Sequence, residues 1–168
     1  IYIALVLYSI LAIGFAWPRP AWLLAASTLT GFAFAFIQQA WRSTWLRALL
    51  LFAITAGLWF GLESLGVSTG LVYGTFHYTG QLGYKAFGLV PLIIPIAWFM
   101  VGAPSMTLAE RLIPAGLPGW LRALLLAATA GLIMTSWDLS MDPMMVAGGN
   151  WVWGRPGAYF GIPIHNFI

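Results

Sequence analysis

Four acidic side chains occur in the 168 residues, and three of them stand at the ends of long apolar runs: Glu63, Asp138 and Asp142. An ionised side chain at membrane depth is costly, so such acids usually serve a function. Each aspartate also has a plainer interpretation, because Asp138 could bond loop amides and Asp142 could form a turn before Pro143. The fourth acid, Glu110, precedes Arg111 in a more polar stretch, which predicts a solvated ion pair.

Three carboxyl groups in water-poor surroundings favour acid catalysis. An apolar site favours the neutral form of a carboxyl group, and a second carboxylate nearby favours it further. One neutral acid beside an ionised partner suits the protonation of a substrate of very low basicity. Counting the apolar runs places the Glu63 end, segment 66–88 and the Asp138 end on one side of the membrane. We therefore expect the three acids to meet.

Other reactive side chains are few. The chain has no cysteine, which excludes disulfides, iron–sulfur clusters and thiol catalysis. The two histidines, His77 and His165, could join carboxylates around a metal. The His-rich clusters of membrane di-iron desaturases are missing, so we predict no metal and instead buried histidines bonded to a carboxylate or tyrosine. Lys85, the only lysine, lies between apolar runs, where a retinal Schiff base is not expected.

Aromatic side chains are abundant on the side of the acids. Their faces stabilise cations, so a chamber of them would suit a carbocation. Packing in the core and interfacial belts of tryptophan predict the same residues equally well. The aromatic residues expected on this side are Trp59, Phe60, Trp98, Phe99, Trp137, Trp151, Trp153, Tyr159 and Phe160.

The composition predicts a polytopic membrane protein. Hydrophobic residues make up 61% of the chain and charged residues 7%, too few to cover a surface in water. The seven basic residues are scattered, which argues against nucleic-acid binding. We expect a single transmembrane domain over 1–168. Because the chain begins at Ile1 without a Met, we expect it to be trimmed at both ends.

The predicted fold is an all-α bundle with about five membrane spans. The apolar runs that predict them are 1–17, 21–41, 45–62, 89–101 and 119–137, with a polar connector at 104–118. In segment 66–88, Gly66, Gly70 and Gly74 recur every four residues, which lets helices or a flat ligand approach the backbone. After Asp142, a Gly-, Pro- and Trp-rich segment that begins at Pro143 is expected to be irregular or re-entrant. At membrane depth such backbone is tolerated only where protein buries it or it lines a cavity.

Two blocks of residues resemble a known family, the membrane carotenoid-biosynthesis proteins that include carotenoid 1,2-hydratases of the bisanhydrobacterioruberin and γ-carotene type. The more specific block comprises Asp138, Asp142-Pro143, Trp151, Trp153, Tyr159-Phe160-Gly161-Ile162-Pro163 and Asn166-Phe167. The supporting block comprises Glu63, Gly66, Gly70, Tyr73-Gly74, Tyr78, Leu82-Gly83, Pro91, Pro95 and Trp98.

The resemblance implies a cofactor-free addition of water to the terminal C1=C2 double bond of an acyclic (ψ) carotenoid end group. It implies a multi-pass protein of the cell membrane that takes its substrate from the lipid phase. Asp138 or Asp142 would donate the proton with the other as its partner, and Glu63 would position water or act as the base. The residues expected to shape the pocket are Tyr73, His77, Tyr78, Trp98, Trp137, Trp151, Trp153, Tyr159 and Asn166.

Two alternatives remain open from the sequence. Another isoprenoid enzyme, such as an end-group cyclase, would use the same protonation but capture the cation with an internal double bond. A non-catalytic protein could instead bind a carotenoid or lipid. A transporter would more naturally show broken helices in matching halves, and no such symmetry is evident.

Overall fold

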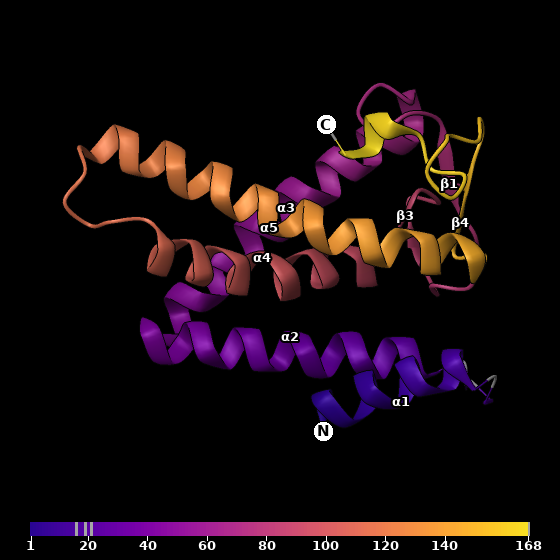
Figure 1. Ribbon diagram of the computed structural model, residues 1–168, viewed down its shortest axis with the longest axis horizontal. Coiled ribbons are helices and arrows are strands. Elements are labelled where there is room, and N and C mark those ends of the chain that lie inside the picture. Colours follow the sequence, from indigo (N-terminus) through magenta and orange to yellow (C-terminus); the bar gives the residue numbers. More distant parts are fainter. Residues whose placement is uncertain (16, 19, 21, 168) are drawn as a thin grey trace.

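Five α-helices dominate the computed structural model, which describes residues 1–15, 17–18, 20 and 22–167 (Figure 1). Four of them are long and apolar enough to cross a membrane, whereas α1 is a shorter apolar helix. The prediction of a helical membrane bundle is therefore confirmed, with the first predicted span forming the short α1. The helices are α1 (Tyr2–Gly14), α2 (Trp22–Arg42), α3 (Trp45–Thr69), α4 (Ile93–Leu112) and α5 (Gly119–Ala147).

Helix α4 is the centre of the bundle, because it contacts α2, α3 and α5. Figure 1 shows α4 and α5 antiparallel and joined by a loop at one end, with the short strands at the other end. Gly31 permits the closest approach between helices. A Cβ atom there would lie 2.5 Å from the Met100 sulfur of α4 and 2.9 Å from the Tyr2 ring of α1. Small residues serve such contacts between membrane helices.

Helix α3 extends beyond its predicted end. It was expected to stop at Leu62, before Glu63, but it continues to Thr69 and ends at Gly70. Gly70 has a φ of 71°, a left-handed conformation that glycine adopts without steric cost, and its N–H donates to the Gly66 carbonyl. Glu63 therefore lies inside the helix, where α3 still packs against other elements.

Helix α5 also continues past its predicted end at Trp137, through Pro143 to Ala147. A proline lacks the N–H that would bond the carbonyl four residues earlier, here that of Leu139. The Tyr159 hydroxyl donates to this Leu139 carbonyl at 2.7 Å. This bond satisfies the Leu139 carbonyl, so α5 continues through Pro143. Both aspartates therefore lie on the helix. The predicted end of this span at Trp137 is therefore wrong, and so is the prediction of irregular backbone for residues 143–147.

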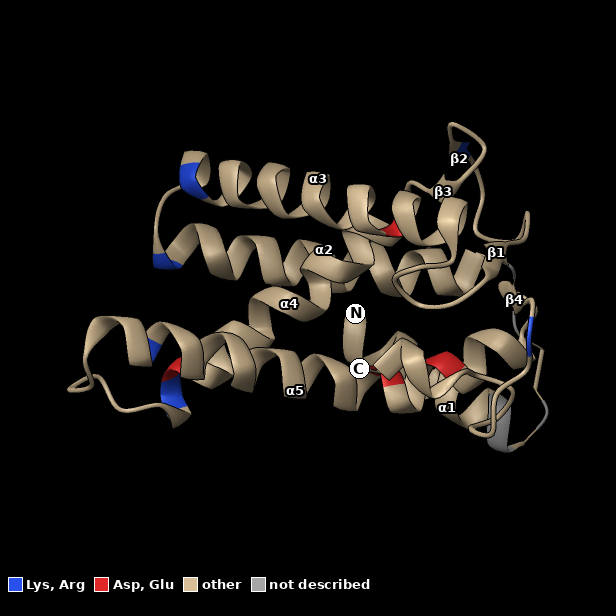
Figure 2. Cartoon of the chain, turned by 90° about the horizontal axis from the view of Figure 1, so that it is seen from above, with Lys and Arg blue, Asp and Glu red and all other residues tan. Residues whose placement is uncertain are grey.

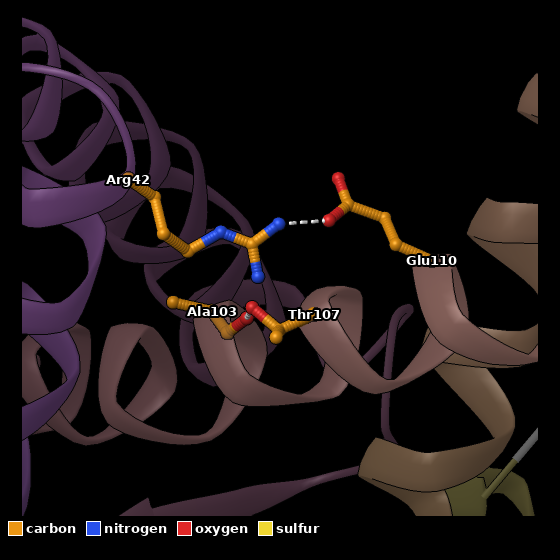
Figure 3. A network of polar contacts seen from close by, with 4 residues as sticks. All are labelled: Arg42, Ala103, Thr107 and Glu110. Atoms are coloured by element: carbon orange, nitrogen blue, oxygen red, sulfur yellow. Dashed lines mark hydrogen bonds and ion pairs between the residues drawn. The ribbon is translucent and has the colours of Figure 1, made fainter.

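Residues 104–112 of the predicted polar connector belong to α4, which runs through Pro104. Glu110 pairs with Arg42 at the end of α2 and not with its neighbour Arg111, as Figure 3 shows. Near this pair, the Thr107 hydroxyl donates to the Ala103 carbonyl at 3.0 Å. The two ion-paired side chains are 41% and 38% exposed, so the pair contributes at most about 1 kcal/mol.

Four short strands, which the sequence did not predict, lie at one end of the bundle. The strand β1 (Phe76–Tyr78) pairs antiparallel with β4 (Trp151–Trp153), and β2 (Lys85–Ala86) pairs with β3 (Val90–Pro91). A final 3₁₀-helix, η1 (Ile164–Phe167), contacts α5. Figure 2 shows the acidic positions of α3 and α5 in the halves of these helices nearer the strands. We call this the strand end.

We predict that Tyr159→Phe lowers the free energy of unfolding by about 1 kcal/mol, because the Leu139 carbonyl loses its donor. In a Pro143→Ala background the same change should cost much less, since residue 143 then supplies an N–H to Leu139. Thermal unfolding of the four proteins in detergent, followed by circular dichroism, measures this coupling. An equal cost of Tyr159→Phe in both backgrounds would show that the hydroxyl does not replace the missing N–H.

Candidate active site

The Glu63 carboxylate is 3% exposed and accepts a hydrogen bond on each oxygen. Oε2 accepts from the Tyr78 hydroxyl at 2.9 Å, and Oε1 accepts from the Trp98 indole Nε1–H at 3.0 Å. A buried carboxylate without such partners is strongly disfavoured. The Trp98 ring is held in turn by a stacked contact with Trp59, at 4.5 Å between ring centroids. Glu63 thus joins α3, β1 and α4 at one point.

The two aspartates lie on one face of α5. Asp138, Met141, Asp142 and Met145 follow the spacing of three and four residues that puts side chains on the same side of a helix. Both methionines pack against the buried cluster at the strand end. Asp142 is 6% exposed, and its Oδ2 accepts from the Asn166 Nδ2 at 2.6 Å. Asp138 is half-buried and has no side-chain hydrogen bond to any described residue.

The small β1–β4 sheet contributes several rings to an aromatic core at the strand end. We define the strand-end cluster by its buried members, Phe76, Tyr78, Val90, Ile94 and Trp151. The Tyr78 ring meets Trp151 edge-on at 5.8 Å, and Phe76 lies 5.0 Å from Trp153. The flanking side chains of Tyr73, Trp98, Met141 and Trp153 pack against the cluster from α4, α5 and the adjoining loop. Glu63 is therefore bonded to this aromatic core, and the aspartate-bearing face of α5 packs against it through Met141 and Met145.

The acids raise the pKa values of two tyrosines at the strand end. Burial raises the pKa of Tyr78 well above its ordinary value, and the charge and hydrogen bond of Glu63 raise it further. Burial likewise raises the pKa of Tyr73, with smaller contributions from the charges of Glu63 and Asp138. The three acids lie in the halves of α3 and α5 nearer the strands, which agrees with the expectation that they share one side.

Gly66 makes room for one of these rings. A Cβ atom at Gly66 would lie 2.8 Å from the Tyr73 ring, so glycine lets the loop after α3 fold back onto the helix. Gly70 ends the helix, and Gly74 has a φ of 96° in the turn before β1. The glycines spaced by four therefore serve a helix end and its return loop.

Several predicted site residues are placed differently from expectation. His77 is exposed on the outer face of β1, because alternation along the strand turns Phe76 and Tyr78 inward. His165 is also exposed, so the expectation of buried, hydrogen-bonded histidines is wrong for both. Trp137 is 42% exposed on α5. Tyr159 uses its hydroxyl on the Leu139 carbonyl. Within the described residues, no group of three or more His, Asp or Glu side chains is placed to hold a metal.

Phe76 and Met141 are important to the site but did not appear among the predicted site residues. Phe76 is at the centre of the aromatic contacts, within 6.1 Å of the rings of Tyr73, Tyr78 and Trp153. The alternation Phe76-His77-Tyr78 is a strand signal, but three residues are too few to distinguish it from a loop. Met141 could have been found from its helical spacing between the two aspartates.

A hollow of about 480 Å³ lies beside the sheet. It separates the turn after α3 from the loop that follows β4. We call it the strand-end hollow, and its lining is Gly70, Gly74, Thr75, Arg155, Pro156, Gly157 and Pro163. A smaller hollow of about 360 Å³ lies beside the Arg42–Glu110 pair, far along the helices from the aromatic core. The polar groups that could do chemistry are thus concentrated at the strand end.

A comparison of the chain with known families identifies the family to which it belongs. The model of the carotenoid biosynthesis protein family matches residues 22–168, which include α2 to α5, the strands and the C-terminal segment. The chain belongs to this family. The predicted resemblance is therefore confirmed at the level of the family.

One similar protein is the bisanhydrobacterioruberin hydratase of Haloarcula japonica. The two sequences are 32% identical over 108 residues. The aligned region covers 64% of this chain and 36% of the relative, so the chain spans about a third of that protein. No solved structure matches the chain. The family membership and this relative direct the proposal below toward carotenoid chemistry.

We predict that Tyr78 makes the protein sensitive to alkaline pH. Its folded-state pKa lies above the ordinary value of about 10, so the unfolded chain loses this proton first as the pH rises. The stability that the neutral hydroxyl contributes is fully present below about pH 10 and is lost progressively above it. Tyr78→Phe should therefore lower the melting temperature at neutral pH but flatten its decline at higher pH.

Melting temperatures in detergent between about pH 8 and about pH 11.5 measure this slope. Tyr84→Phe provides the control, because Tyr84 is 75% exposed and belongs to the same end of the molecule. Equal slopes for the wild type and Tyr78→Phe would contradict the assignment.

Proposed function

We propose that this protein is a carotenoid hydratase, which adds water across the terminal C1=C2 double bond of an acyclic carotenoid end group. The observation that supports the proposal is the placement of Glu63, Asp138 and Asp142 at the strand end, beside an aromatic core, in a member of the carotenoid biosynthesis family. The hydratase name of the relative agrees with it. We also propose that the protein lies in the cell membrane and takes its substrate from the lipid phase.

The first step is protonation of the alkene. An alkene is a very weak base, so the donor must be a neutral carboxylic acid held in a place that excludes bulk water. Asp138 suits this role best, because it is half-buried and no described side chain occupies its oxygens. Its O–H bond breaks, a C2–H bond forms, and a tertiary cation is left at C1. Asp142, oriented by Asn166, is the neighbouring carboxylate that stabilises this charge.

The second step is capture of the cation by water. The faces of Tyr73, Trp151 and Trp153 border the site and suit a cation before water arrives. A water oxygen forms a bond to C1, and one of its O–H bonds breaks. The proton passes to the carboxylate that donated in the first step, which restores the starting state. Glu63 keeps free lone pairs on both oxygens and can hold the water by accepting its other hydrogen.

The proposal predicts a specific product in cells that make lycopene. When the full-length protein is present, chromatography with mass detection should find a carotenoid heavier by one water, with an unchanged polyene absorption band. An isomer of unchanged mass would instead identify an end-group cyclase. No new carotenoid, with the protein inserted in the membrane, would favour a non-catalytic carotenoid-binding role.

Amide variants test the assigned acids. Asp138→Asn, Asp142→Asn and Glu63→Gln should each lower the hydration rate by at least about 100-fold, because they remove the proton donor, the carboxylate that stabilises the cation and the group that holds the water, respectively. Glu110→Gln is the matched control, since the fourth acid pairs with Arg42 away from the site and should leave the rate unchanged. Near-normal rates in all three site variants, at equal protein levels, would refute the mechanism.

A further inference from the structure

Two turns at the strand end hold a phenylalanine in a backbone conformation that side chains rarely adopt. Phe87 has a φ of 52° and Phe160 a φ of 49°, and each is followed by a glycine with a positive φ. The turns span 86–89 and 159–162, and each is closed by a hydrogen bond from its last N–H to its first carbonyl, at 3.0 and 2.7 Å. Turns with two positive φ angles favour Asn-Gly, because a bulky side chain is strained there. The requirements of the turn therefore do not explain either phenylalanine.

Packing inside the protein does not explain these phenylalanines either. Phe87 is 87% exposed and Phe160 is 71% exposed. An exposed aromatic ring on a strained turn is unfavourable in water on both counts, because the backbone strain remains and the apolar surface stays hydrated. An apolar environment outside the protein would offset the strain by burying the ring.

The turn that holds Phe87 lies beside α3, a helix that is long and apolar enough to cross a membrane. Figure 2 shows β2 and β3 next to the strand-end half of this helix. The centre of the Phe87 ring is 6.2 Å from that of Phe60, which belongs to α3. Phe60 precedes the last residue of the helix, Thr69, by nine positions, or about 14 Å along the axis. The tip of the β2–β3 hairpin therefore reaches back along the span.

The length of α3 converts this position into a membrane depth. Its 25 residues make a helix of about 38 Å, which exceeds a hydrocarbon layer of about 30 Å by about 4 Å at each end when centred. Phe60 then lies roughly 10 Å inside the hydrocarbon. Helical side chains lean toward the N-terminus, which for α3 is away from the strand end. A ring 6.2 Å from that of Phe60 is therefore inside the hydrocarbon whatever the direction between the two rings.

The polar groups of the β2–β3 hairpin are compatible with such a depth. Backbone donors in lipid must find partners within the protein. The N–H groups of Gly88, Leu89 and Leu92 donate to carbonyls of the same hairpin, at distances between 3.0 and 3.2 Å. Lys85, its only charged residue, donates its Nζ to the Tyr78 carbonyl at 3.1 Å. The charge of the hairpin is therefore held by the protein, and its exposed side chains are aromatic or aliphatic.

We infer that the tip of the β2–β3 hairpin inserts into the hydrocarbon beside α3, where phospholipid acyl chains cover the Phe87 ring. The base of the hairpin stays in the protein, because Val90 is fully buried in the strand-end cluster. Tyr84, which is 75% exposed, suits the headgroup boundary, where tyrosine is enriched. The hairpin thus anchors the strand-end cluster to lipid close to the depth of Glu63, three positions from Phe60 in α3. This membrane contact does not depend on the proposed hydratase function.

A spin label measures the depth of the tip. Residues 1–168 contain no cysteine, so Phe87→Cys in the full-length protein, with any cysteine elsewhere replaced by serine, carries one nitroxide. In phosphatidylcholine vesicles, oxygen concentrates in the hydrocarbon and a nickel chelate stays in water, and power-saturation EPR gives the accessibility to each. The ratio of oxygen to nickel accessibility should match that of Leu58→Cys, a residue of α3 that is 64% exposed. It should exceed that of Gln81→Cys, in the exposed loop before the hairpin, by at least about 5-fold.

Two results would overturn the inference. A ratio at position 87 equal to that at position 81 would place the tip in water. Low accessibility to both reagents would show that another polypeptide, and not lipid, covers the ring.

A second variant keeps an aromatic ring at the tip. Benzoylphenylalanine in place of Phe87 should, on illumination, form an adduct with a phosphatidylcholine acyl chain that mass spectrometry detects. The same replacement at Leu58 is the positive control, and that at Gln81 should give no lipid adduct. An adduct at position 58 without one at position 87 would contradict lipid insertion. Because hydration of lycopene is measured separately, neither experiment decides the proposed function.

Discussion

The burial of one carboxylate, Glu63, determines the geometry of the strand end. Because this carboxylate is almost fully enclosed, each oxygen needs a donor, and the donors come from two other elements. Trp98 attaches α4 to α3, and Tyr78 attaches β1. Once Tyr78 is fixed, the register of β1 with β4 places Trp151 opposite it and Trp153 opposite Phe76. The aromatic core thus follows from the requirements of a single acid in the middle of a long apolar helix.

A second constraint acts on the side of α5, through the C-terminal segment. Tyr159 satisfies the carbonyl that Pro143 leaves unpaired, and Asn166 donates to Asp142 one turn further along the inner face. Gly157 allows the C-terminal segment to fold back on itself within a few residues. A Cβ atom there would lie 2.2 Å from the Ile162 carbonyl oxygen, too close for any other residue. The two aspartates are therefore held by a segment that comes after them in the chain.

The helices and the placement of the acids toward one end of the bundle could be predicted from the sequence, because hydropathy and helix counting are properties of local segments. Prediction failed where a polar group finds its partner far along the chain. Pro143 was read as a helix breaker because its compensation by Tyr159, 16 positions later in the numbering, is not a local signal. Glu110 was paired with the adjacent Arg111, whereas Arg42 on another helix reaches it. The histidine error has the same origin, since the outward direction of His77 depends on a strand pairing that its own neighbours do not reveal.

The proposed reaction makes opposite demands on water, and the sheet offers a way to meet both. Protonating an alkene requires that bulk water be excluded, yet one water molecule must then be admitted. The inner side of β1 presents Phe76 and Tyr78 to the core, while His77 on its outer side is exposed. The same strand pair therefore separates the acids from the outside and holds the donors. The raised pKa of Tyr78 keeps its hydroxyl neutral, so it remains a donor to the Glu63 carboxylate. The strand that supplies the Tyr78 donor to the buried Glu63 carboxylate thus also forms the barrier that keeps the surroundings of this acid dry.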